Sequence, residues 1–256
     1  MVNIFMNKTK SLTIAHLKNI ALILMFINHF FVIYSNYFPL YGIIYNLQSF
    51  ITRPSFILFA FLLSEGMCHT KNRNKYMLRL LILAFISEPI YDKAFYGSWF
   101  YVLDQNVLFD LFMGAVAICI YDNFHDSKLK LVIALGLLIV IDMFLNFSYN
   151  YVAIGVILGF YILKENRNKN IIMFILIITL SIARYIKLYL TDVLLLNESL
   201  FYAAEASCRV FALPFIRRYN GEKGKQLPKY FYYLFYPVHI ALIYLVLNFV
   251  GNIELF

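Results

Sequence analysis

Ionisable side chains inside otherwise apolar segments are the first candidates for chemistry in this sequence. His29 lies near the end of the first apolar run, next to Asn28, and Arg53 lies beside Pro54 at the start of the second. A charge at the centre of a bilayer costs about 3 kcal/mol, so such residues usually face a cavity or a partner and mark function. The unperturbed pKa of an imidazole, about 6.5, suits proton transfer near neutral pH. His29 is therefore our candidate general base.

Further polar residues fall at a similar depth in several apolar runs. Together they predict one water-accessible cavity that opens outward and contains charges of both signs. Taken singly, Asp142 and Arg184 are better explained as side chains that reach the membrane interface. The predicted outer set is His29 with Asn28, Arg53, Glu88, Asp92, Gln105, Asn106, Asp110, Asp142 and Arg184.

A second polar set falls at the opposite ends of the same runs. Membrane topology and attraction to anionic headgroups explain most of its loop charges. Arg209 and Glu65 lie within or at the edge of apolar runs, so they could line a mouth for an anionic cytosolic ligand, such as a phosphorylated cofactor. His239 fits a packed core histidine as well as a site residue. This inner set is Glu65, His69, the run Lys71–Arg79 with Arg73, Arg209, Arg217, Arg218, Lys223, Lys225 and His239, which follows Tyr236-Pro237.

The composition indicates what kind of molecule holds these residues. Of 256 residues, 62% are hydrophobic and 14% are charged, and the mean hydropathy is +0.72. A soluble domain needs about 25% charged residues to cover its surface. The sequence therefore predicts a polytopic membrane protein. Its three cysteines lack disulfide-framework and zinc-ligand spacing, so we expect no metal, and because the basic residues follow membrane topology we expect no nucleic-acid partner.

The apolar runs predict an all-α bundle of about nine transmembrane helices in a single domain over residues 1–256. A helix needs about 20 mostly apolar residues to cross the hydrocarbon core. The runs are continuous, whereas barrel strands would alternate at every second residue. The predicted spans are residues 12–34, 48–68, 76–96, 105–121, 129–147, 151–163, 171–190, 199–216 and 230–250.

The distribution of lysine and arginine predicts the orientation of these spans. With the N-terminus in the cytoplasm, sixteen lysines and arginines fall in cytoplasmic segments, while only Lys93 and Lys187 fall in outer ones. Positive residues accumulate on the cytoplasmic side of membrane proteins. An odd number of crossings keeps this pattern in phase, so the chain would end outside, at Phe256.

Three classes of function fit a polar outer cavity, a basic inner mouth and a histidine between them. An enzyme would take an activated group from a cytosolic donor and pass it to an acceptor outside. A transporter or flippase for a small envelope precursor would use the same cavity, but it would favour two pseudo-symmetric halves, which nine spans do not provide. A scaffold without turnover is the third class. We favour the enzyme, although the chain has no soluble-enzyme motif such as a P-loop or G-x-S-x-G.

Several short strings carry a family resemblance through their order and spacing. They are Ile27-Asn28-His29-Phe30, Arg53-Pro54-Ser55-Phe56, Leu63-Ser64-Glu65-Gly66, Ile86-Ser87-Glu88-Pro89, Gln105-Asn106-Val107 and Tyr236-Pro237-Val238-His239. From about residue 20 to about residue 245 the chain resembles the TraX family. This resemblance implies a multi-helix acetyltransferase of the bacterial cytoplasmic membrane. One member acetylates the N-terminus of conjugative pilin.

The TraX family is similar to wider transmembrane acyltransferases, which carry an acetyl group from cytosolic acetyl-CoA to an acceptor across the membrane. In that group a histidine in an early helix is catalytic, and His29 occupies the matching position. The family typically has Asp directly before this histidine, where this chain has Asn28. An orienting carboxylate would then come from another helix, as Glu88, Asp92 or Asp110.

The resemblance and the polar sets together suggest a role for each residue. His29 would act as general base or as acyl carrier, with Arg53, Asn106 and Gln105 stabilising charge. Glu88 and Asp92 would pair with Arg53 or His29. The acetyl-pantetheine arm would pass Arg209, Tyr236 and His239. The rest of the cofactor would lie at a mouth formed by Glu65, His69, Arg73, Arg79, Arg217, Lys223 and Lys225. The acceptor would be a peptide or an envelope glycan or polymer.

Overall fold

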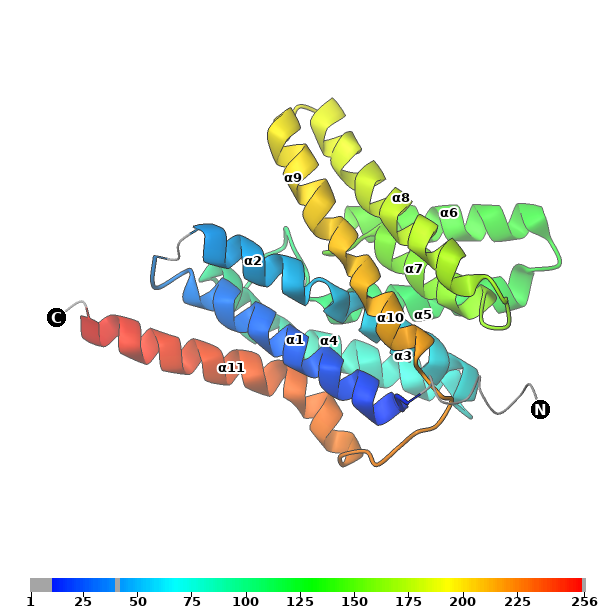
Figure 1. The fold of residues 1–256 in the computed structure, drawn as a ribbon, viewed down its shortest axis with the longest axis horizontal. Coiled ribbons are helices and arrows are strands. Elements are labelled where there is room, and N and C mark those ends of the chain that lie inside the picture. Colours follow the sequence, from blue (N-terminus) through cyan, green and yellow to red (C-terminus); the bar gives the residue numbers. More distant parts are fainter. Residues whose placement is uncertain (1–10, 40–41, 255–256) are drawn as a thin grey trace.

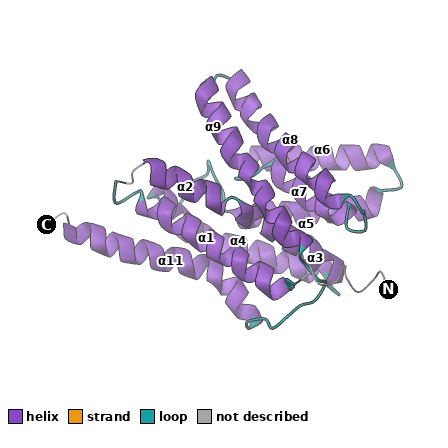
Figure 2. Ribbon diagram, viewed as in Figure 1, coloured by secondary structure: helices purple, strands orange, loops and turns teal. Residues whose placement is uncertain are grey.

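The structure is a computed structural model that describes residues 11–39 and 42–254. Lys8, Lys10 and Phe256, which enter the predicted orientation, lie outside these ranges. The described chain is built from helices (Figure 2), with isolated bridges between Leu12 and Tyr219 and between Gln105 and Phe147. The predicted all-α class is confirmed.

The helices follow the predicted spans closely, which indicates that long apolar runs decide where they form. The predicted span 48–68 is divided between two helices, and the span 199–216 is divided among three. The elements are α1 (Ile14–Tyr34), α2 (Gly42–Thr52), α3 (Pro54–His69), α4 (Arg73–Tyr96), α5 (Val107–Phe124), α6 (Lys128–Phe144), α7 (Tyr151–Ile162), α8 (Lys169–Leu190), α9 (Leu196–Ser207), the 3₁₀ helix η1 (Cys208–Ala212), α10 (Leu213–Arg217) and α11 (Lys229–Glu254).

Within the described residues, six helical segments are long and apolar enough to cross a membrane. They are α1, α2 with α3, α5, α8, α9 through α10, and α11. The other three predicted spans are α4, which contains Pro89 and several charges, and the shorter helices α6 and α7. The chain is therefore a multi-pass membrane protein, and the number of nine crossings stays a prediction.

Local chemistry explains where the helices that carry the polar residues begin. Pro54 occupies the first turn of α3, where its missing N–H breaks no helical hydrogen bond. This places Arg53 at the junction of α2 and α3. The side chain of Asn106 accepts from the backbone N–H of Leu108 and caps α5. Between α9 and α10, the tighter turn of η1 contains Arg209.

The helix α3 lies at the centre of the bundle and contacts α1, α5, α7 and η1. Figure 1 shows α11 running alongside α1, and α8 and α9 packed as an antiparallel pair. Most side chains of α3 are buried, and they form the middle of one continuous hydrophobic core. Polar groups from helices far apart in sequence therefore meet around the N-terminal end of α3.

Candidate active site

A cavity of about 230 Å³ lies among α1, the junction of α2 and α3, α4, α8, η1 and α11. We refer to it as the arginine cavity, because Arg53, Arg184 and Arg209 line it. His29 lies fifteen residues along α1 from Ile14, about 22 Å at 1.5 Å per residue. The cavity therefore lies nearer the predicted outer ends of the helices. The other polar lining residues are Asn28, His29, Thr52, Ser55, Tyr91, Ser148, Tyr149, Tyr185 and Tyr236.

Two buried histidines contact each other at this cavity. Nδ1 of His29 lies 2.7 Å from Nε2 of His239, and the two rings are stacked. Nδ1 of His239 lies 2.5 Å from the backbone carbonyl oxygen of Phe235, which can only accept. With both rings neutral, His239 therefore donates from Nδ1 and accepts from His29 at Nε2. Nε2 of His29 is then unprotonated, as a general base requires.

The structure places His239, rather than a carboxylate, beside His29. The ring of His29 also packs edge-on against Phe95 and Tyr236. No carboxylate of the described residues lies within ion-pair distance of it, which corrects the expectation that Glu88, Asp92 or Asp110 orients this imidazole. His239 takes that place.

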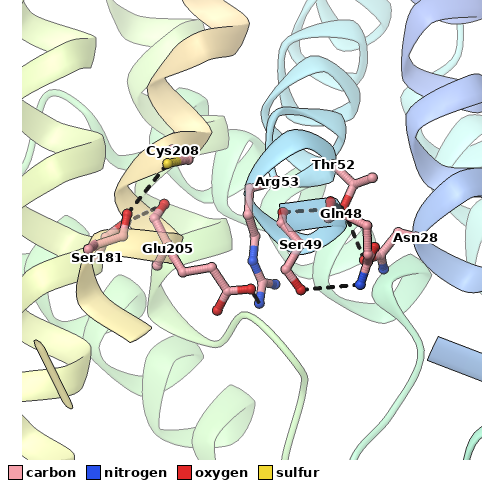
Figure 3. Close-up of polar contacts among 10 residues, drawn as sticks. Asn28, Gln48, Ser49, Thr52, Arg53, Ser181, Glu205 and Cys208 are labelled. Carbon is pink, nitrogen blue, oxygen red and sulfur yellow. Dashed lines mark hydrogen bonds and ion pairs between the residues drawn. The ribbon is translucent and has the colours of Figure 1, made fainter. Parts of the chain in front are cut away.

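Asn28, next to His29 in sequence, contacts the neighbouring helix. Its Oδ1 lies 3.1 Å from the hydroxyl of Thr52 on α2, and Figure 3 shows the two side chains facing each other. An amide oxygen held in this way leaves the amide NH₂ available to donate. Asn28 therefore presents a neutral donor at the cavity wall.

Arg53 forms an ion pair with a residue that belongs to neither predicted polar set. Its Nη2 lies 2.8 Å from Oε1 of Glu205 on α9, and the Glu205 side chain is only 4% exposed. Figure 3 shows the guanidinium reaching from the end of α2 toward Glu205. The predicted pairing of Arg53 with Glu88 or Asp92 is wrong. Glu205 is the one carboxylate in the predicted span 199–216, which was a signal for it.

Arg209 lies in the arginine cavity rather than at the predicted cytoplasmic mouth. It is 2% exposed, and its guanidinium lies over the ring of Tyr149. Its Nη1 lies 3.3 Å from the hydroxyl of Ser181. Tyr236, also expected along the donor path, lines the same cavity, and His239 contacts His29 of its wall. The structure therefore joins part of the predicted inner set to the outer set.

Arg184 was expected to be an interfacial side chain, but it lines the arginine cavity. Its Nη1 donates to the backbone carbonyl of Ser148 at 2.7 Å, which connects α8 to the segment between α6 and α7. Position in sequence could not distinguish an interfacial side chain from a cavity residue, because both would lie at the same depth.

Glu88, Asp92 and Asn106, all predicted to be catalytic, do not line the arginine cavity. The backbone N–H and side-chain amide of Asn106 both donate to Glu88. Asp92 accepts from the backbone N–H of Tyr101 at 2.8 Å. These contacts hold the connection between α4 and α5, and the catalytic role of the three residues stays a prediction.

A second cavity, of about 300 Å³, lies toward the predicted cytoplasmic ends of the helices. We refer to it as the leucine cavity. Nζ of Lys18 lies 3.0 Å from Oε1 of Gln226 at its wall, and Phe59 lines both cavities. The lining residues are Lys18, Leu22, Phe59, Leu62, Leu63, Tyr76, Leu80, Leu83, Leu108, Leu111, Gln226, Leu227, Tyr232 and Tyr233.

Most residues predicted to bind the cofactor lie near this end of the bundle but outside the leucine cavity. Arg73 pairs with Asp122 and donates to the hydroxyl of Tyr161. Arg79 is exposed, and the exposed Lys225 directly precedes Gln226 of the cavity wall.

Glu65 and His69 lie one helical turn apart on α3, with 3.5 Å between Oε2 and Nε2. Burial, and then the neighbouring carboxylate of Glu65, raises the pKa of Tyr219 to about 12. Tyr219 therefore stays protonated at neutral pH and can donate to Glu65. This cluster links α3 to the segment after α10.

Among the described residues, no three His, Cys, Asp or Glu side chains gather as metal ligands.

Comparison with known proteins decides the family. A family model described as TraX protein matches residues 13–247. The chain belongs to the TraX family. All the lining residues of both cavities fall inside the range that matches TraX.

The TraX chain is also similar to one protein from Dichelobacter nodosus. That protein is named probable fimbrial assembly protein FimC, serogroup H1. The two are 27% identical over 221 residues, which cover 78% of this chain and 82% of the relative. No solved structure matches the chain.

Proposed function

We propose that this TraX family chain is an integral membrane acetyltransferase. It moves an acetyl group from cytosolic acetyl-CoA to an amine or hydroxyl of a peptide or envelope polymer at the outer face of the bacterial cytoplasmic membrane. The observation that carries the proposal is the buried pair of His29 and His239 at a polar cavity. Family membership and a relative named for fimbrial assembly support an acceptor in the cell envelope.

Acetyl transfer needs a base for the acceptor proton, and Nε2 of His29 is suited to that task. The acceptor nitrogen or oxygen attacks the thioester carbonyl carbon while His29 takes its proton. The carbon–sulfur bond then breaks, and His29 returns the proton to the departing thiolate. His239 keeps the base in the required tautomer through its contact with Nδ1 of His29.

The same reaction needs donors for the negative charge that develops on the carbonyl oxygen. Arg53 lines the cavity and is fixed by Glu205, which supports its predicted role. The amide of Asn28 also lines the cavity, next to His29, and takes the role that was predicted for Asn106. Both groups are held before any ligand arrives, which lowers the cost of reorganisation during the reaction.

The leucine cavity fits the donor on chemical grounds. Its leucines suit the methylene and dimethyl groups of the pantetheine arm, Gln226 and the tyrosines offer polar groups for its amides, and Lys18 supplies a positive charge at one side. The exposed Arg79 and Lys225 lie at the same end of the bundle and would bind phosphates of CoA. Because Phe59 lines both cavities, an arm bound here would point toward His29.

Replacing the base tests the proposal. We expect His29→Ala to lower acetyl transfer from labelled acetyl-CoA by about 100-fold or more, the size of a lost general base. The exposed His125, in the segment between α5 and α6, provides a matched control, and His125→Ala should retain wild-type turnover. Wild-type turnover by His29→Ala would refute the assignment of the base. Failure of the folded wild-type protein to bind acetyl-CoA would refute the donor and favour transport through the cavity.

A further inference from the structure

The charged side chains that line the arginine cavity are all positive. Three guanidinium groups line it, from Arg53, Arg184 and Arg209, and its described lining residues include no aspartate or glutamate. Removing a charged group from water is costly unless a partner of opposite charge replaces the hydration. The positive charges on the cavity wall therefore exceed the negative charges that could neutralise them.

Among the described residues, no carboxylate near the cavity forms an ion pair with Arg184 or Arg209. Among the described residues, Glu205 forms an ion pair with Arg53 alone. Asp104 accepts from the hydroxyls of Tyr91, Tyr96 and Ser148. Asp110 accepts from the backbone N–H groups of Tyr149 and Asn150. Asp142 interacts electrostatically with Arg184, but no ion pair joins them within 4.0 Å.

Arg209 is the clearest case of an unmatched charge. It is 98% buried, and its electrostatic neighbours include the like charges of Arg53 and Arg184. Its Nε is buried without a hydrogen-bond partner among the described residues, and the same is true of Nε of Arg53. A buried donor without a partner destabilises the protein, and more so when it is charged. An anion in the cavity would remove this destabilisation.

We propose that the arginine cavity binds an oxyanion of the acceptor, a phosphate ester or a carboxylate, a few bonds from the nucleophilic amine or hydroxyl. Guanidinium groups match the planar oxygen pairs of these anions and bind them with charge-assisted hydrogen bonds. The assignment of this oxyanion to the acceptor rests on the proposed function, whereas the anion site itself does not. The anion would hold the nucleophile beside Nε2 of His29, which lines the same cavity.

The anionic group belongs to the acceptor rather than to CoA because of its place in the bundle. Arg184 lies fifteen residues from the start of α8, about 22 Å along the helix and at a depth similar to that of His29. A donor that arrives from the cytoplasm must bring its thioester to this depth first, with its phosphates behind it. The phosphates therefore remain near the leucine cavity.

Binding of small probes tests this inference without acetyl-CoA. The purified protein is studied in dodecyl maltoside, in buffer free of phosphate and sulfate, and ligand affinity is taken from the saturable rise in apparent Tm. The probes are O-phosphoethanolamine, β-alanine and ethanolamine, which share an amine and differ in the anion. We expect the better of the two charged probes to bind at least about tenfold more tightly than ethanolamine, a difference of about 1.4 kcal/mol.

Arginine variants show whether the probe occupies this cavity. Arg209→Gln and Arg184→Gln should each weaken binding of the charged probe by about tenfold or more, because each removes a charge-assisted hydrogen bond. Arg209→Lys keeps the positive charge, so its affinity for the charged probe should fall less than that of Arg209→Gln. The exposed Arg167, between α7 and α8, provides the control, and Arg167→Gln should bind normally.

The outcomes separate this inference from the proposed function. Equal binding of all three probes, or normal binding by both Arg→Gln variants, overturns it. Displacement of the charged probe by adenosine 3′,5′-bisphosphate also overturns it, because the cavity would then hold CoA. Probe binding by His29→Ala, with no acetyl transfer by the wild type, would keep the anion site and reject the acetyltransferase. Tighter binding of phosphoethanolamine than of β-alanine identifies a phosphate ester, and the reverse identifies a carboxylate.

Discussion

His239 decides which nitrogen of His29 is free to accept a proton, through a 2.7 Å contact between the rings. Without His239, nothing selects the Nδ1–H tautomer, and the ring also loses a packing partner. We expect His239→Ala to lower kcat by about 10-fold to 100-fold, less than the loss of the base itself, while KM for acetyl-CoA changes little. Steady-state CoA release measures both constants.

A conservative variant separates positioning from packing. The Oε1 of glutamine can accept a hydrogen bond at the place of Nε2 of His239, so His239→Gln should recover part of the rate lost in His239→Ala. The recovery should appear in kcat and not in the amount of folded protein. A His239→Ala enzyme with normal kcat would show that His29 needs no orienting partner.

The identities of several site residues could be predicted from the sequence, but their partners could not. His29 and Arg53 stand out because ionisable residues are rare in apolar runs. Their contacts with His239 and Glu205 join residues 210 and 152 positions apart. Such contacts depend on which helices pack together, and apolar surfaces that face lipid or protein look alike in sequence. Depth along a run therefore grouped Glu88 and Asn106 with His29, although neither lines the arginine cavity.

Helices could be predicted with more success than the site, because each depends on a local apolar run. The predicted span 76–96 became α4 (Arg73–Tyr96), and the span 129–147 became α6 (Lys128–Phe144). The division at Arg53 follows from Pro54, at which α3 begins, although the predicted span 48–68 runs through it. The 3₁₀ turn at Arg209 has no comparable local signal, and it depends on how α9 packs against α8 and η1 against α3.

The close approach of α5 and α7 depends on one glycine. A Cβ added to Gly114 would lie 2.2 Å from Cδ1 and 3.0 Å from Cβ of Ile157. Gly114→Ala should therefore force the helices apart and destabilise the protein by about 1–3 kcal/mol. Thermal unfolding in detergent, followed by intrinsic fluorescence, measures the loss as a lower apparent Tm.

A glycine in α6 is the matched control for this substitution. A Cβ at Gly136 would meet no atom within 4 Å, so Gly136→Ala should leave the apparent Tm unchanged or raise it slightly, because alanine favours helix. Equal effects of the two substitutions would show that the contact between Gly114 and Ile157 does not limit the packing of α5 and α7.

The crossing number is a property of the whole molecule, and α4 is the segment that most needs a test. In a variant without the three native cysteines, Lys71→Cys and Ser98→Cys would lie on either side of α4, and Asp126→Cys would follow α5. We expect a membrane-impermeant maleimide to label Ser98→Cys in intact cells and to leave the other two unlabelled. Lysed membranes should label all three. Labelling of Lys71→Cys and Ser98→Cys from the same side would show that α4 does not cross.

Communication between the two cavities also belongs to the whole molecule, and it depends on Phe59, the one described residue that lines both. Phe59 is half-buried on the central helix α3. A larger ring should narrow the passage, so we expect Phe59→Trp to keep acetyl-CoA affinity within about twofold, less than 0.5 kcal/mol, and to lower acetyl transfer by about tenfold. Phe59→Leu, which removes ring volume, should transfer at the wild-type rate or faster.

Unchanged binding of the charged probe would show that the arginine cavity is intact in both variants. Normal transfer by a folded Phe59→Trp protein would mean that the acetyl group reaches His29 by another route, since no other described residue connects the leucine cavity to the arginine cavity.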